Sequence, residues 1–168
     1  MKLEQGENMK LNLEQIKTFL PHRDPFLFID RVDSIQFPPG IDLKNIESKS
    51  LVGTQIKAAF LVKKEMEIFK GHFPGNPILP GVIQIEMMAQ ASSFAIIPLL
   101  KDPFSNTLEV ALLAADGAKF RKPVVPGMEL EIQSVVARAR GSIYSYECKI
   151  FHQNELCSET SIMASAKF

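Results

Sequence analysis

The chain has 168 residues, of which 46% are hydrophobic, and its 19 basic side chains balance its 19 acidic ones. This size and composition predict one domain with a substantial core, over residues 1–168. Zero net charge provides no general attraction for nucleic acid or an anionic membrane. Residues 1–8 lack the apolar core of a signal peptide, and no apolar run approaches the roughly 18 residues of a membrane span. We therefore expect a cytoplasmic protein without nucleic-acid binding or membrane insertion.

The N-terminal third of the chain predicts a short helix and two strands. Asn12 can cap a helix over residues 12–20, and Gln15 is placed to complete a capping box. Residues 26–32 and residues 55–62 are rich in apolar and β-branched or aromatic side chains, and each predicts a strand.

The middle of the chain predicts a long helix over residues 81–98, which Pro98 should end. This segment is apolar around almost its whole circumference, so the helix should be buried. Glu86, Gln90 and Ser93 follow one another at steps of four and three residues and form a single polar stripe on it. A buried carboxylate such as Glu86 needs a partner or a chemical function.

The C-terminal part of the chain predicts an antiparallel meander. Its expected strands are residues 108–114, 118–120, 129–140, 143–152 and 155–167. One long buried helix followed by several strands must lie in the concave face of the sheet, since that arrangement covers the whole helix surface. The sequence therefore predicts an α+β fold in which an antiparallel sheet wraps around one long buried helix.

Neither a metal nor a nucleotide cofactor is expected. Cys148 and Cys157 flank a predicted hairpin and would lie diagonally on one face, too far apart for an unstrained disulfide. Neither cysteine has the spacing of a zinc site, and the three histidines are scattered. Glycine-rich phosphate-binding signatures are also missing.

The most informative segment is the loop of residues 71–81, which contains three prolines and three glycines around His72. Such a loop has little backbone freedom and would hold the imidazole in place. A glycine at the helix start, Gly81, leaves backbone N–H groups free to bind an anion, and Glu86 lies one turn further on. His72 could instead be a turn residue, and Glu86 a structural ion-pair partner hydrogen-bonded to Gln90. Their combination favours a base, an anion site and an acid in one enzyme.

Three segments in order resemble one known family. They are GHFPGNPILPGVIQIEMMAQ at residues 71–90, LPHRDPFLFIDRV at 20–32 and KFRKPVVPG at 119–127. The chain is similar in these segments to the FabZ-type (3R)-hydroxyacyl-[acyl-carrier-protein] dehydratases of type II fatty acid synthesis, which have the hotdog fold. The resemblance covers roughly residue 13 to the C-terminus.

The resemblance implies that His72 is the catalytic histidine and Glu86 the catalytic carboxylate. A second set of residues is assigned to substrate binding: Gly81, Gln90, Phe73 and Val82. On this hypothesis His72 removes the C2 proton, the Gly81 N–H stabilises the enolate-like oxygen, and Glu86, kept protonated by burial, assists loss of the C3 hydroxyl. Gln90 would support Glu86.

The resemblance also implies an acyl carrier protein as partner and a homodimer, or a trimer of dimers, with His72 and Glu86 of each site from different subunits. The basic cluster Lys119, Arg121 and Lys122 is a candidate docking site for an acidic carrier protein, and otherwise a solvated strand edge. Hotdog folds also include acyl thioesterases, which hydrolyse the thioester with a helix-borne carboxylate. A non-catalytic carrier-binding subunit is a third possibility, against which the intact His72 and Glu86 argue.

Overall fold

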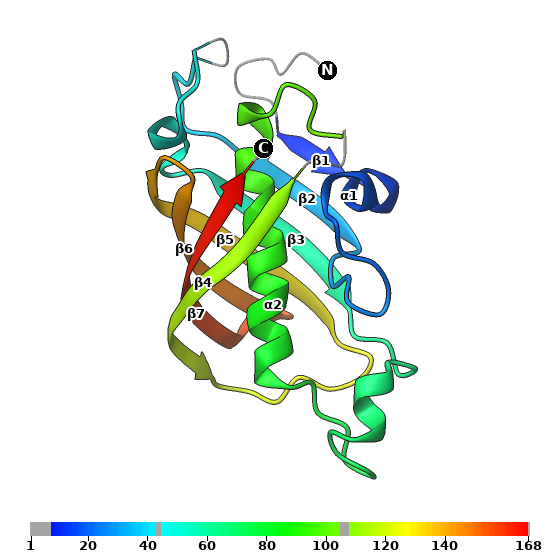
Figure 1. Ribbon diagram of the computed structural model, residues 1–168. Helices are drawn as coiled ribbons and strands as arrows, with labels where there is room; N and C mark the ends of the chain where they lie inside the picture. Colours follow the sequence, from blue (N-terminus) through cyan, green and yellow to red (C-terminus); the bar gives the residue numbers. More distant parts are fainter. Residues whose placement is uncertain (1–7, 43–44, 105–107, 168) are drawn as a thin grey trace.

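The computed structural model describes residues 8–42, 45–104 and 108–167 (Figure 1). Seven antiparallel strands form one sheet in the order β1-β2-β3-β5-β6-β7-β4, which confirms the predicted α+β architecture. The strands are β1 (Met9–Leu11), β2 (Arg31–Gln36), β3 (Gln55–Leu61), β4 (Glu109–Phe120), β5 (Glu129–Arg140), β6 (Ile143–His152) and β7 (Glu155–Lys167). The α-helices are α1 (Leu13–Phe19) and α2 (Gly81–Ser92), and the 3-10 helices are η1 (Ser48–Leu51), η2 (Glu67–Lys70) and η3 (Ser93–Leu99). Residues 1–7, part of the segment used above to argue against a signal peptide, lie outside the described residues.

Helix α1 begins with the predicted capping box. The Asn12 side chain accepts a hydrogen bond from the Gln15 backbone N–H, and the Gln15 side chain accepts one from the Asn12 N–H, both at 3.0 Å. These two contacts satisfy donors that the first turn of a helix cannot pair internally. The adjacent short strand β1 was not predicted, because three residues are too few to show a strand pattern.

The C-terminal meander has the predicted strands, with one difference. Strand β4 is continuous, and its pairing with β7 is interrupted by irregularities between Leu112 and Ala114 and between Asp116 and Lys119. The bulges disturb the alternation of side chains, which is why the sequence pattern suggested two strands. Both cysteines, Cys148 and Cys157, are free and buried.

Helix α2 lies in the concave face of the sheet, and the strands curve around it in Figure 1. Its α-helical part ends at Ser92, and η3 continues the rod to Leu99 with Pro98 inside it. Pro98 has no N–H to donate, and Ser92 Oγ and Ser93 Oγ bond to carbonyls one turn earlier, which favours the tighter 3-10 winding. The segment Gly81–Leu99 is long and apolar enough to cross a membrane by composition alone, but here it is the core helix of the sheet.

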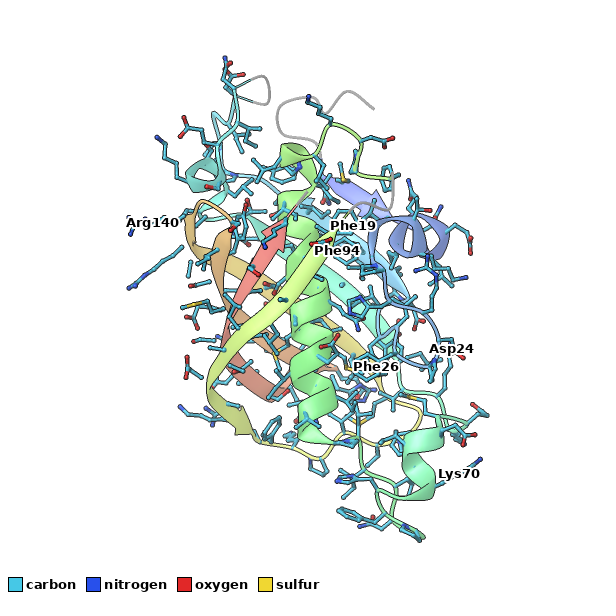
Figure 2. All side chains as sticks on the ribbon, in the orientation of Figure 1. Phe19, Asp24, Phe26, Lys70, Phe94 and Arg140 are labelled. Atoms are coloured by element: carbon cyan, nitrogen blue, oxygen red, sulfur yellow. The ribbon has the colours of Figure 1, made fainter. Side chains whose placement is uncertain are left out.

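The strand predicted over residues 26–32 was wrong, since β2 begins only at Arg31. The Gln90 side chain forms hydrogen bonds with backbone groups of this segment that would otherwise pair with a neighbouring strand. Its Oε1 accepts a hydrogen bond from Phe28 N at 2.9 Å, and its Nε2 donates to Phe26 O at 2.9 Å. The segment that precedes β2 is thereby attached to α2, and Figure 2 shows Phe26 lying against this helix.

Candidate active site

The loop between η2 and α2 holds His72 by its own backbone. His72 Nδ1 lies 2.7 Å from the carbonyl oxygen of Ile78, and Ile78 N donates to His72 O at 3.0 Å. A carbonyl oxygen only accepts hydrogen bonds, so Nδ1 must carry a proton. In the neutral imidazole this leaves the lone pair on Nε2, which is the nitrogen that can act as a base.

The ring of Phe73 stacks on the imidazole, with 4.0 Å between the ring centroids. Phe73 is 49% exposed, although it is a large apolar side chain. It therefore presents an apolar surface to solvent beside His72.

Glu86 lies on α2, one turn from its start, and is only partly exposed. Its Oε1 accepts a hydrogen bond from Gln90 Nε2 at 2.9 Å and lies 3.2 Å from His22 Nε2. His22 comes from the segment between α1 and β2, which is attached to α2 through Gln90. Glu86 and Gln90 of the predicted stripe are therefore hydrogen-bonded to each other, and His22 joins them from a distant part of the chain. Ser93, the third residue of the stripe, instead donates to the carbonyl oxygen of Ala89.

The pKa of Glu86 differs from the expectation that burial keeps this carboxyl protonated. Burial raises the pKa, but the hydrogen bonds from His22 and Gln90 and the charge of His22 lower it, and the net pKa is below the ordinary value of 4.5. Together, His22 and Gln90 affect this pKa more than desolvation does, because both bond directly to the carboxylate and the carboxylate is still partly exposed to solvent. Glu86 is consequently ionised at neutral pH in the structure.

Gln90 is 1% exposed, and both N–H groups of its amide are engaged, one with Glu86 and one with Phe26. It supports Glu86 and the segment before β2. Val82, by contrast, is 70% exposed at the start of α2.

Gly81 begins α2 after Pro80, and no side chain in the described part of the chain caps this helix terminus. A Cβ atom at position 81 would lie 2.6–2.9 Å from three ring atoms of Phe120 on β4, so the aromatic ring packs against the bare glycine backbone. A pocket of about 500 Å³ opens here. Its walls include His72, Gly81, Val82, Gln84, Ile85 and Phe120.

Comparison with known proteins identifies the family. Residues 47–161 match the ApeI-like family, described as ApeI dehydratase. The 3-hydroxyacyl-[acyl-carrier-protein] dehydratase FabZ of Anaplasma marginale (strain Florida) is 38% identical over 93% of this chain and 97% of its own length. The enzyme of the same name from Helicobacter hepaticus is 37% identical over 95% of this chain and 92% of its own length. The chain belongs to the FabZ dehydratase family.

Solved structures support the fold of this FabZ-family chain. The dehydratase heterocomplex ApeI:P from Xenorhabdus doucetiae superposes with a TM-score of 0.65 at 17% identity, covering 92% of this chain and 91% of its own. A hot-dog-like protein from Thermanaerovibrio acidaminovorans gives 0.56 at 13% identity over 73% of this chain and 88% of its own. These similarities confirm the hotdog fold.

The structure does not bring all predicted site residues together within one FabZ-family chain. Among the described residues no hydrogen bond joins His72 to Glu86, and their partners are Ile78 and the His22–Gln90 pair. In the basic cluster, Arg121 pairs with Glu159 at 2.5 Å and Lys122 pairs with Glu155. Two of the three proposed docking cations are therefore already compensated within the chain.

His22 is the residue that sequence reasoning missed. It lies in the quoted segment 20–32, yet no role was assigned to it. The sequence did contain a signal for it: a buried carboxylate such as Glu86 requires a partner, and His22 was a possible partner that had been given no role. Its Nδ1 is buried without a hydrogen-bond partner among the described residues.

We expect His22→Phe to raise the pKa of Glu86 above its value in the unmodified protein, because burial then acts with only the Gln90 hydrogen bond against it. A lowered folded-state pKa stabilises the protein above the unfolded-state pKa, and this stabilisation is lost as the pH falls through the folded-state pKa. The variant should therefore begin acid unfolding at a higher pH. The measurement is a ¹³C titration of the Glu86 carboxyl, with His152→Phe at the end of β6 as control. An unchanged midpoint in His22→Phe would contradict the pairing.

We expect Gly81→Ala to destabilise the fold by about 1 kcal/mol, because the new methyl group overlaps the Phe120 ring. In a Phe120→Ala background the same change should be neutral or stabilising, since alanine loses less conformational entropy than glycine on entering a helix. Urea unfolding of the four proteins measures the coupling. Equal effects in both backgrounds would show that the packing of the Phe120 ring does not require a glycine at position 81.

Proposed function

We propose that the protein dehydrates (3R)-hydroxyacyl-[acyl-carrier-protein] to trans-2-enoyl-[acyl-carrier-protein] in fatty acid biosynthesis, in the cytoplasm. The observation that carries the proposal is the imidazole of His72 in the wall of the pocket, with Nδ1 bonded to Ile78 O and the Nε2 lone pair left for catalysis. Membership of the FabZ family supports the substrate class.

In the proposed reaction, His72 Nε2 removes the proton from C2 of the thioester. The N–H of Gly81, at the uncapped start of α2, donates to the thioester oxygen as negative charge develops there. The helix terminus is suited to this role because its N-cap residue, Pro80, has no side-chain acceptor that would compete for these donors. Formation of the C2–C3 double bond then expels the C3 hydroxyl.

The departing hydroxyl needs a proton to leave as water, and the ionised carboxylate of Glu86 cannot supply one alone. We propose that the proton comes from the imidazolium form of His22, whose Nε2 lies 3.2 Å from Glu86 Oε1, and that His22 becomes neutral as it passes the proton to Glu86. Glu86 delivers it to the hydroxyl, and the proton taken by His72 from C2 restores the pair after product release. This modifies the hypothesis of a carboxyl protonated through burial alone.

A second copy of the chain would complete the site. Strand β4 is an edge of the sheet, and its side chains Leu112 and Leu113 are 47% and 51% exposed. A long apolar edge strand is a template for pairing with another chain, and exposed Val82 and Phe73 add apolar surface around the start of α2. We propose a homodimer in which His72 of one subunit works with Glu86 of the other, or a trimer of such dimers.

The acyl carrier protein is the proposed partner. We retain Lys119, Arg121 and Lys122 as its docking residues, since exposed ion pairs contribute little stability and can exchange one carboxylate for another. Arg121 and Lys122 also line the pocket that contains His72.

The test uses a 3-hydroxyacyl thioester on a carrier protein and follows enoyl-thioester absorbance and free thiol together, with His72→Ala as control. We expect enoyl product without free thiol, lost in the variant. Free thiol without enoyl product would instead identify a thioesterase. If neither enoyl product nor free thiol forms with substrates of several acyl chain lengths, the result would favour a carrier-binding subunit.

A further inference from the structure

Gln84 is a buried amide at the start of α2 that the proposed chemistry does not use. It is 3% exposed. Its Nε2 donates to the carbonyl oxygen of Leu79 at 3.3 Å, and its Oε1 accepts a hydrogen bond from Ser158 Oγ at 2.7 Å. Ser158 lies on β7 and is fully buried. The amide thus bridges the loop before α2 to the sheet that surrounds the helix.

This bridge lies one peptide unit away from the group that holds His72. The peptide between Ile78 and Leu79 is bonded at both ends, since Ile78 O faces His72 Nδ1 at 2.7 Å and Leu79 N donates to Val124 O at 2.7 Å. The next peptide unit has only its carbonyl to bond, because Pro80 has no N–H. That carbonyl is Leu79 O, the acceptor of Gln84.

The orientation of the Gln84 amide is determined by Ser158. A hydroxyl that donates to Oε1 places the amide oxygen toward β7, and the NH2 group then points back to Leu79. A buried carbonyl without a donor would be costly, so the amide and the carbonyl stabilise each other in this arrangement. The Leu79–Pro80 and Ile78–Leu79 peptide units share the Leu79 Cα atom, which links the position of Leu79 O to that of the Ile78 carbonyl.

We propose that Gln84 is a positioning residue for His72. By holding Leu79 O, and with Ser158 holding Gln84, it keeps the Ile78 carbonyl against His72 Nδ1, which fixes the tautomer and direction of the imidazole. This inference rests on the proposed function for its effect on turnover, whereas its effect on the imidazole stands on the geometry of the loop.

Gln84→Met tests the proposal, because methionine has a similar length and cannot donate to Leu79 O. We expect kcat for enoyl formation to fall on the order of tenfold to a hundredfold, with KM changed less than about threefold, since the base is displaced while the pocket remains. The ¹⁵N shifts of His72 should change from one tautomer, protonated on Nδ1, to a mixture with the Nε2-protonated form. Ser158→Ala, which frees the amide to rotate, should give a smaller change in the same direction and serves if Gln84→Met does not fold.

The matched control is Ser92→Ala. Ser92 is a buried polar residue of the same helix, 1% exposed, and its Oγ lies 2.7 Å from Ser134 Oγ, so the variant loses a buried hydrogen bond away from the loop. It should keep the kcat and the single His72 tautomer. Unchanged ¹⁵N shifts in both Gln84→Met and Ser158→Ala, or the same shift changes in Ser92→Ala, would overturn the proposal. If the unmodified protein forms no enoyl product, the proposed function fails, and the ¹⁵N shifts alone decide the role of Gln84.

Discussion

Replacing Glu86 with glutamine is expected to lower turnover about a thousandfold or more while the melting temperature changes by only a few degrees. The glutamine oxygen can still accept the hydrogen bond from Gln90 Nε2, so the contacts of the segment before β2 persist. Glutamine cannot receive a proton from His22 or deliver one to the leaving hydroxyl. Enoyl-thioester absorbance measures kcat, and thermal unfolding followed by circular dichroism measures stability.

The matched control is Glu131→Gln on the exposed face of β5, which makes the same chemical change away from the pocket. It should keep full turnover. A fully active Glu86→Gln enzyme would show that the carboxyl does not take part in the reaction. An unfolded variant would show that the carboxylate is needed for the fold.

Mixing two inactive variants is expected to restore turnover if the sites are shared between subunits. His72→Ala and Glu86→Gln are each inactive alone under the proposed mechanism. After unfolding and refolding together in equal amounts, half of the dimers are heterodimers, and each contains one site with both an intact His72 and an intact Glu86. The mixture should therefore recover roughly a quarter of the unmodified activity, as random pairing about a two-fold axis requires.

The controls for this experiment are each variant refolded alone and the two variants mixed without unfolding. Exposed apolar side chains on β4 and at the start of α2 provide the surface through which the subunits would pair. A refolded mixture that stays inactive while native mass spectrometry shows heterodimers would place both residues of a site in one subunit. If the unmodified protein sediments as a monomer, the proposal of a dimer is wrong.

Much of the fold was predictable because its signals are local. The predicted strands over residues 129–140, 143–152 and 155–167 match β5, β6 and β7, since alternation of buried and exposed side chains is a period of two that does not depend on distant partners. The Asn12–Gln15 capping box is local in the same sense. The start of α2 at Gly81 was also predictable, because proline and glycine restrict or free the backbone wherever they occur.

The contacts that define the candidate site were less predictable because they join distant segments. Gln90 pairs with Phe26 and Phe28 more than sixty residues away, and this side-chain pairing replaces the strand that the local pattern suggested. Nothing in the spacing of residues 20–32 indicates that a side chain of α2 would satisfy their backbone.

By itself, the sequence determined the type of fold, the rigid loop around His72 and the polar stripe with Glu86, because backbone restriction and side-chain periodicity are properties of adjacent residues. Only the tertiary structure decided that His22 meets Glu86, that this contact lowers the pKa of a partly buried carboxyl, and that Gln84 and Ser158 hold the loop behind His72. The physical reason is that charge stabilisation and hydrogen bonding depend on the distance and direction between groups, which folding brings together from separate parts of the chain.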